Sequence, residues 1–314
     1  MKRFCIILAL LLAVGLAGCA KDSGAENTVQ QPTATELNLS PAYRETTQPK
    51  DSDATGEAPE AVRQTEPADS DFVRIRDYIP DAVCELPYAS RDNFTGDVVY
   101  DFTEPFLRYG TVKKLTQVQQ ELKQGGMFLK IWDGFRPTSA QYTLWEAFPN
   151  ANYVSNPDKG FSSHSRGNTV DVTLVYADGS PVIMPTGYDD FTPLADRDYS
   201  DCEPGAAANA MLLERIMESY GFTPYFGEWW HFSDTKSYPI EESFTPAPGY
   251  PYFAQCSEYI SLRGRPDTGA EVLCTIPAGE EFELIAWYGS FAMVDYRDAW
   301  GYVLREYVAP VEVG

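Results

Sequence analysis

The stretch SSHSRGNTVD, residues 162–171, contains one of only two histidines in this chain of 314 residues. His164 and Asp171 lie within it, and the second histidine, His231, ends the motif EWWH of residues 228–231. Histidine nitrogens and a carboxylate oxygen are typical ligands of a catalytic zinc, which commonly has three protein ligands and one open position. Two unrelated buried histidines, each satisfied by hydrogen bonds, are the alternative. The neighbouring carboxylates favour one zinc ion per chain, bound by His164, Asp171 and His231.

The segments around these motifs predict a mixture of helices and strands. Apolar residues near helical spacing, followed by glycine, indicate helices over residues 111–124 and 204–220, and Pro137 begins a third over residues 138–148. Apolar or alternating runs indicate strands over residues 127–132, 170–175 and 229–233. Because strands do not alternate regularly with helices, we predict an α+β domain with a small antiparallel sheet flanked by helices.

Glu228 and Arg136 are candidate catalytic residues. Glu228 lies three residues before His231. A carboxylate near the metal but outside the ligand set can take a proton from water and pass it to a leaving amine. Arg136 lies in WDGFRP, residues 132–137, and its planar guanidinium can stabilise the oxyanion that forms when water attacks an amide. The structural alternatives are a surface acid for Glu228 and a salt-bridged arginine for Arg136.

These motifs together resemble those of the D-alanyl-D-alanine dipeptidase family, the zinc peptidases linked to vancomycin resistance. The resemblance covers about residues 72–240. Residues 162–171 match S-x-H-x-x-G-x-x-x-D, residues 228–231 match E-x-x-H, and residues 133–137 match D-G-Y-R-P with phenylalanine in place of tyrosine. The stretch YASRDNFTG, residues 88–96, also resembles the family's N-terminal part. Four motifs in the right order make the match specific.

The resemblance also implies a role for each residue. It places zinc on the three ligands named above, makes Glu228 the general acid/base and makes Arg136 the group that stabilises the transition state. It further implies that Ser162 and Asp189 hold the free ammonium of a dipeptide, with Asp190 as an adjacent competitor. A carboxylate close to a primary ammonium favours a dipeptide over a long peptide.

The N-terminal part of the chain predicts export. Residues 1–19 combine a charged start, a short apolar run and the ending LAGC, which resembles the lipobox of bacterial lipoproteins. Cys19 would then carry lipid and anchor the protein to the bacterial cell membrane outside the cytoplasm; an ordinary secreted protein is the alternative. Residues 20–70 are polar and predict a disordered tether. The net charge of −22 argues against nucleic acid as a partner.

Residues 253–314 predict a second, smaller module after a catalytic domain of residues 71–245. Short strand signals separated by turns indicate a small all-β barrel. The pattern resembles bacterial SH3-like domains, which often bind cell-wall peptides. A spacer domain without a ligand is the alternative.

Four cysteines follow the lipobox, and an exported chain can form disulfides. Three connectivities are possible. We expect Cys84 to pair with Cys202 and Cys256 with Cys274, because each pair then stays inside one folding unit.

Three functions fit this sequence. The first is a lipid-anchored zinc D,D-dipeptidase that hydrolyses D-Ala-D-Ala or a closely related wall dipeptide, which the EWWH form and Asp189 favour. The second is a zinc D,D-carboxypeptidase that trims the terminal D-Ala from peptidoglycan stem peptides, which export and the C-terminal module favour. The third is a non-catalytic wall-binding lipoprotein, against which the retention of every candidate site residue argues.

Overall fold

The computed structural model describes residues 66–311, which belong to one compact unit. The predicted signal of residues 1–19, with Cys19, and residues 20–65 of the predicted tether lie outside the described residues. Residues 66–70, predicted as tether, are part of the fold: Glu66 accepts a hydrogen bond from the Tyr109 hydroxyl at 2.8 Å, and Asp69 pairs with Lys113 at 2.7 Å. No helix within residues 66–311 is both long and apolar enough to span a bilayer.

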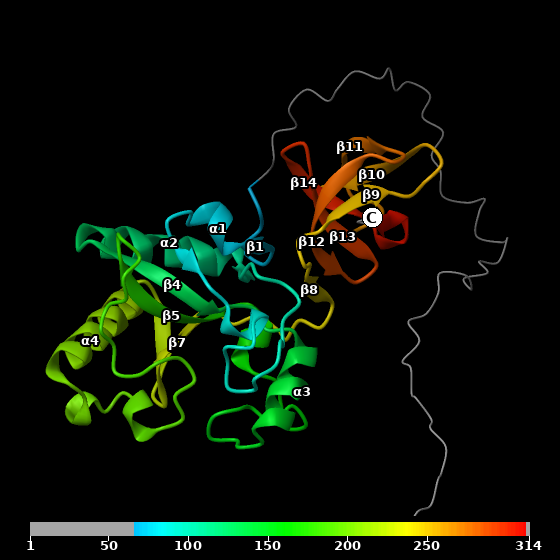
Figure 1. The fold of residues 1–314 in the computed structure, drawn as a ribbon. Helices are drawn as coiled ribbons and strands as arrows, with labels where there is room; N and C mark the ends of the chain where they lie inside the picture. Colours follow the sequence, from blue (N-terminus) through cyan, green and yellow to red (C-terminus); the bar gives the residue numbers. More distant parts are fainter. Residues whose placement is uncertain (1–65, 312–314) are drawn as a thin grey trace, which may run out of the picture. The chain divides into compact units, whose positions relative to one another are not determined.

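A five-stranded sheet forms the centre of the catalytic part (Figure 1). Its order is β2-β4-β5-β7-β6, with bounds Val83–Cys84, Met127–Asp133, Thr169–Tyr176, Glu228–Asp234 and Phe222–Tyr225 respectively. The strands predicted over residues 127–132, 170–175 and 229–233 are confirmed as β4, β5 and β7. The sheet is mixed rather than antiparallel throughout, because β2 runs parallel to β4. The long connection between these two strands, which includes a helix, permits the parallel pairing.

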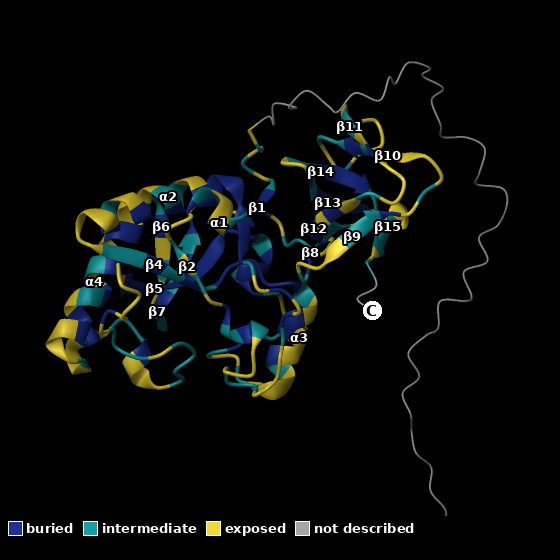
Figure 2. Ribbon diagram, turned by 45° about the horizontal axis from the view of Figure 1, so that its top comes forward, coloured by how far each residue is buried: buried dark blue, intermediate teal, exposed yellow. Residues whose placement is uncertain are grey.

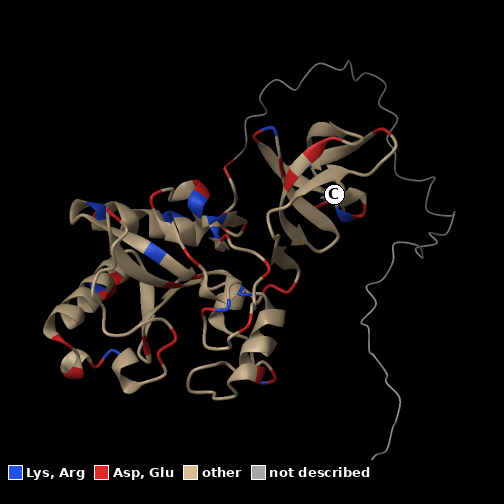
Figure 3. Cartoon of the chain, in the orientation of Figure 1, with Lys and Arg blue, Asp and Glu red and all other residues tan. Residues whose placement is uncertain are grey.

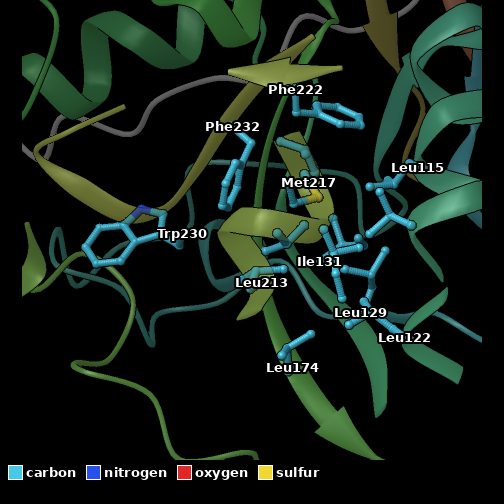
Figure 4. Close-up of a cluster of buried hydrophobic side chains, with 14 of the residues drawn as sticks. Leu115, Leu122, Leu129, Ile131, Leu174, Leu213, Met217, Phe222, Trp230 and Phe232 are labelled. Atoms are coloured by element: carbon cyan, nitrogen blue, oxygen red, sulfur yellow. The ribbon is translucent and has the colours of Figure 1, made fainter. Parts of the chain in front are cut away.

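Two long helices pack on this sheet with their apolar sides inward. The bounds are α1 Ile75–Tyr78, α2 Tyr109–Gln124, α3 Thr138–Ala147 and α4 Pro204–Ser219, so the three predicted helices are confirmed. Yellow, exposed positions follow the outer sides of α2 and α4 in Figure 2. Their inner sides meet β4 and β5 in one buried cluster, shown in Figure 4, that includes Leu115, Leu122, Leu129, Leu174, Leu213 and Met217.

The C-terminal part is an antiparallel sheet of eight strands. The strands are β8 Phe244–Pro246, β9 Pro251–Ala254, β10 Tyr259–Arg263, β11 Val272–Pro277, β12 Glu281–Tyr288, β13 Phe291–Tyr296, β14 Ala299–Leu304 and β15 Val308–Pro310. The order is β11-β10-β14-β13-β12-β9-β15, with β8 also paired to β12. The predicted all-β character is therefore confirmed, while the SH3-like barrel stays a prediction. Figure 3 shows more acidic than basic colour on this sheet.

The predicted disulfides are wrong: Cys84, Cys202, Cys256 and Cys274 are all free thiols. Cys84 lies on the edge strand β2, whereas Cys202 follows a short 3-10 helix before α4. Cys274 lies opposite Leu262 in the β10–β11 ladder, and Cys256 precedes the start of β10. A disulfide needs Cα atoms within about 7 Å, which closeness in one folding unit does not guarantee.

Candidate active site

Three elements bring the predicted metal ligands together. Asp171 of β5 lies directly opposite His231 of β7, so the two side chains share one face of the sheet. His164 comes from the 3-10 helix η3 (Ser163–Arg166), which ends at Gly167 in a left-handed conformation (φ 74°). This glycine turns the chain into β5, and a Cβ there would lie 2.4 Å from the Phe72 ring. The turn at Gly167 therefore lets His164 and Asp171 approach each other.

The ligand atoms converge on one point. His164 Nε2 lies 3.3 Å from Asp171 Oδ1, His231 Nδ1 lies 3.1 Å from the same oxygen, and the two nitrogens are 3.3 Å apart. The three residues form a group able to hold a metal ion, with all ligand atoms within 4.8 Å of one another. This grouping is the one that the spacing of the two histidines predicts.

The protonation pattern of these residues fits a cation. His164 Nδ1 lies 2.8 Å from the Gly134 carbonyl oxygen and donates to it, which leaves Nε2 as a lone-pair donor. Asp171 Oδ1 is buried and accepts no hydrogen bond, while Oδ2 accepts one from the Tyr188 hydroxyl at 3.0 Å. Burial raises the pKa of Asp171, whereas the two histidines, when they are protonated, lower it well below its usual range. A buried, ionised oxygen without a donor is the kind of group that a metal ion satisfies.

Glu228 lies beside the ligand group without belonging to it. It begins β7, and its Oε2 is 3.5 Å from His231 Nδ1. Burial raises the pKa of this carboxyl to about 7 in the metal-free site, and Asp171 and Asp189 also act in that direction. A carboxyl that titrates near neutral pH can both take up and return a proton, as a general acid/base must.

Arg136 is held firmly at the cavity wall. Its Nε and Nη2 both donate to Asp133 Oδ2, at 3.0 and 2.7 Å, and its Nη1 donates to Gln141 Oε1 at 3.2 Å. Its guanidinium also lies 5.4 Å from the centre of the Tyr88 ring. Arg136 is therefore a salt-bridged arginine and also lines the cavity, and its catalytic role stays a prediction.

The two predicted ammonium-binding residues both line the cavity. The Ser162 hydroxyl also caps η3, where it accepts a hydrogen bond from the His164 amide at 3.4 Å. Asp189 Oδ2 accepts a hydrogen bond from the Tyr88 hydroxyl at 2.8 Å, and burial raises the pKa of Asp189 to about 7. Asp190, the competitor, instead accepts a hydrogen bond from the Thr192 amide and is not among the lining residues.

The cavity that joins these groups has a volume of about 250 Å³. Its polar side carries the residues described above. Its other side is apolar and includes Phe94, Leu144, Tyr153 and Phe191. A space of this size suits a small ligand of one or two residues better than a long peptide lying in an open groove.

Three supporting residues were not singled out from the sequence. Asp133 is fully buried and also accepts a hydrogen bond from Tyr100 at 2.9 Å; its spacing of three residues before Arg136 was the available signal. Tyr188 orients Asp171 through the hydrogen bond given above. Arg197 donates to the His231 carbonyl at 3.0 Å and to Glu214 at 2.8 Å, and no local pattern around it indicated this role.

The fold and the site define a mixed α/β protein with the two-histidine, one-carboxylate centre typical of metal-dependent hydrolases. The profile of the family described as D-ala-D-ala dipeptidase, Peptidase_M15, matches residues 68–247. This chain belongs to that family.

Relatives of this family are similar to most of the catalytic part. The D-alanyl-D-alanine dipeptidase of Escherichia coli (strain K12) is 34% identical over 173 residues, which cover 54% of this chain and 89% of the relative. The enzyme of the same name from Streptomyces coelicolor is 30% identical over 199 residues, covering 57% and 98%. The one from Enterococcus faecalis is 34% identical over 168 residues, covering 47% and 83%.

A solved structure gives a more distant likeness. It is a vancomycin resistance D,D-pentapeptidase in complex with Zn(II), 15% identical, with a TM-score of 0.28. The match covers 42% of this chain and 74% of that one. At this TM-score the likeness carries no argument about the present chain.

Proposed function

We propose that this protein is a zinc-dependent D,D-dipeptidase that hydrolyses D-Ala-D-Ala or a closely related cell-wall dipeptide. The observation that carries the proposal is the convergence of His164, Asp171 and His231 on one point, with Glu228 beside them in a small cavity. The relatives that match over most of their own length bear the name D-alanyl-D-alanine dipeptidase, which agrees with this assignment.

Each polar residue of the cavity has its own role in amide hydrolysis. A zinc ion held by the three ligands would lower the pKa of water and polarise the scissile carbonyl. Glu228 takes the proton of the attacking water at a carboxylate oxygen and delivers it to the nitrogen of the leaving D-Ala. Arg136, kept cationic and fixed by Asp133, stabilises the negative charge that develops on the carbonyl oxygen.

Asp189 and Ser162 support recognition of the substrate's free amino end. A buried carboxylate satisfied by a single tyrosine hydroxyl has capacity left for an ammonium group, and binding that cation would ionise Asp189. A peptide with further residues before the dipeptide has no ammonium at this position. Selection against longer peptides follows from that loss.

The runner-up is a D,D-carboxypeptidase acting on stem peptides. Incubation of the purified, zinc-loaded protein with D-Ala-D-Ala and with a pentapeptide ending in D-Ala-D-Ala separates the two functions. We expect D-Ala to be released from the dipeptide, and we expect Asp189→Asn to raise KM far more than the neighbouring control Asp190→Asn. Release of D-Ala from the pentapeptide alone would establish the carboxypeptidase instead.

The N-terminal part of the chain determines where the enzyme acts. We propose that Cys19 carries lipid and anchors the protein outside the cytoplasm, which metabolic labelling with a fatty acid and loss of label in Cys19→Ala would test.

We also propose that the C-terminal sheet is an SH3-like domain that binds wall peptides. Trp287 supports this, because Arg305 lies 4.3 Å from its ring centre and Tyr252 lies beside it at 5.9 Å. Unchanged sedimentation with purified peptidoglycan in Trp287→Ala would exclude that surface.

A further inference from the structure

The catalytic part and the C-terminal sheet share one buried aromatic cluster. It consists of Phe72, Phe106, Phe135 and Phe244 together with Ile285, Ala286, Phe291, Met293 and Tyr302 of β12, β13 and β14. We propose that the C-terminal sheet is a positioning element of the active site, which holds the backbone segments that carry Arg136 and His164 in place. This inference rests on the proposed dipeptidase function.

Phe135 connects the cluster to Arg136, its neighbour in the chain. The Phe135 ring is 1% exposed and meets Phe72 and Phe244 edge to face, with centroids 4.7 and 5.3 Å away. Phe72 and Phe244 stack on each other at 4.0 Å. Phe244 begins β8, which pairs with β12 of the C-terminal sheet. Phe135, which stands where the family motif has tyrosine, therefore packs with its apolar ring against this sheet.

The backbone around Phe135 transmits its position to both sides of the site. The Phe135 amide donates to the Phe106 carbonyl at 2.7 Å, and a Cβ on Gly134 would lie 2.8 Å from that same oxygen. The Gly134 carbonyl accepts the hydrogen bond from His164 Nδ1. A shift of Phe135 would therefore displace the guanidinium of Arg136 and the ring of His164 together, because the backbone of residues 134–136 is in close contact with Phe106.

A second connection runs through Glu241 to η3, the 3-10 helix that carries His164. Glu241 Oε2 accepts from Tyr288 of β12 and from Arg108, each at 3.3 Å, and the Glu241 amide donates to the Ser165 carbonyl at 2.8 Å. Arg108 also donates to the Arg166 carbonyl at 3.1 Å. The C-terminal sheet thus contacts the segment around His164 independently of Phe135.

This support lies outside the part of the chain that the family profile covers. The profile ends at residue 247, whereas β12 to β14 span residues 281–304. Without these strands, an apolar face that contains four phenylalanine rings would be open to water beside the active site. Covering that face is strongly favourable, at about 25 cal/mol per Å² of apolar surface removed from water.

Two phenylalanines of the C-terminal sheet provide a matched test. Phe291 of β13 belongs to the shared cluster, and Phe282 of β12 belongs to the sheet's own core; they are 7% and 5% exposed. In the full-length, zinc-loaded protein, we expect Phe291→Ala to lower kcat for D-Ala-D-Ala by about tenfold or more with little change in KM, as misplaced catalytic groups do. Phe282→Ala should lower Tm comparably and leave kcat within about twofold of wild type at a temperature well below both transitions. Equal kcat values for the two variants would overturn the inference.

Amide hydrogen exchange gives a readout that does not depend on the substrate. Residues 134–136 and 163–167 should exchange faster in Phe291→Ala than in Phe282→Ala. If wild type hydrolyses no dipeptide, the proposed function fails, and the exchange comparison still decides the positioning role. Should either alanine variant not fold, the pair Phe291→Leu and Phe282→Leu makes the same comparison with a smaller cavity. Identical exchange in these two segments for both variants would contradict the inference.

Discussion

The hydroxyl of Tyr188 offers the sharpest test of how the metal ligands are supported. Tyr188→Phe deletes the group that donates to Asp171 Oδ2 at 3.0 Å, while the ring keeps its contacts with Trp132 and Trp230. A hydrogen bond to a charged group contributes about 1.5–3 kcal/mol, and each 1.4 kcal/mol is about a factor of ten in an equilibrium constant. We therefore predict that Tyr188→Phe weakens zinc binding by about 10- to 100-fold, in the range found for partners of metal ligands.

Competition with a chromophoric zinc chelator measures this change directly. Tyr88→Phe is the matched control, because it also deletes a phenol hydroxyl of the site, but one that donates to Asp189, which is not a metal ligand. Its zinc affinity should stay within about twofold of wild type, while its KM for the dipeptide changes. Equal zinc affinity in Tyr188→Phe and wild type would refute the view that Asp171 is oriented by this phenol.

Further predictions concern the acid/base residue, a metal ligand and the substrate carboxylate. Glu228→Ala should retain zinc and lose about 10²- to 10⁴-fold in kcat, measured by D-Ala release and metal analysis; a normal rate would exclude Glu228 as the general base. His231→Ala should lose both zinc and turnover, and bound zinc at wild-type affinity would remove His231 from the ligand set. Asp189 has a pKa raised from 3.8 to about 7 by burial, so the folded, metal-free protein keeps a proton that the unfolded chain releases. Stability therefore falls as pH rises between these values. In metal-free protein, Asp189→Asn should thus be more stable than wild type above pH 7, by on the order of 4 kcal/mol, and the difference should vanish near pH 4 in denaturant titrations. A difference that does not vary with pH would contradict the buried, protonated state of Asp189.

Local patterns predicted the elements that position the site better than they predicted how distant segments meet. Helix α2 ended at its glycine, α4 ended close to its own, and the strands followed their apolar runs, because backbone preference and burial act over a few residues. The parallel pairing of β2 and the free state of Cys84 and Cys202 depend instead on where separate segments lie in space. A pattern within a few residues does not show which distant segments of the chain meet in the folded protein.

In the candidate site, too, residues within short motifs were predictable and residues without a local pattern were not. The ligands and Glu228 were predictable because they lie in short motifs that contain the only two histidines. Arg197 was not, because it reaches the backbone of His231 from a loop with no distinctive pattern. The shared cluster around Phe135 was also unforeseen, since residues 71–245 and 253–314 were expected to have separate cores. A single phenylalanine in place of tyrosine gave the only local sign of a changed environment.

Titration of the metal-free protein with zinc shows whether this chain is a zinc-dependent D,D-dipeptidase. We predict that D-Ala release from D-Ala-D-Ala is absent without metal, rises in proportion to added zinc and stops rising at one equivalent per chain, the number that the group His164, Asp171 and His231 can hold. Hydrolysis that proceeds at full rate without metal, or a fully zinc-loaded protein that leaves D-Ala-D-Ala intact, would contradict it.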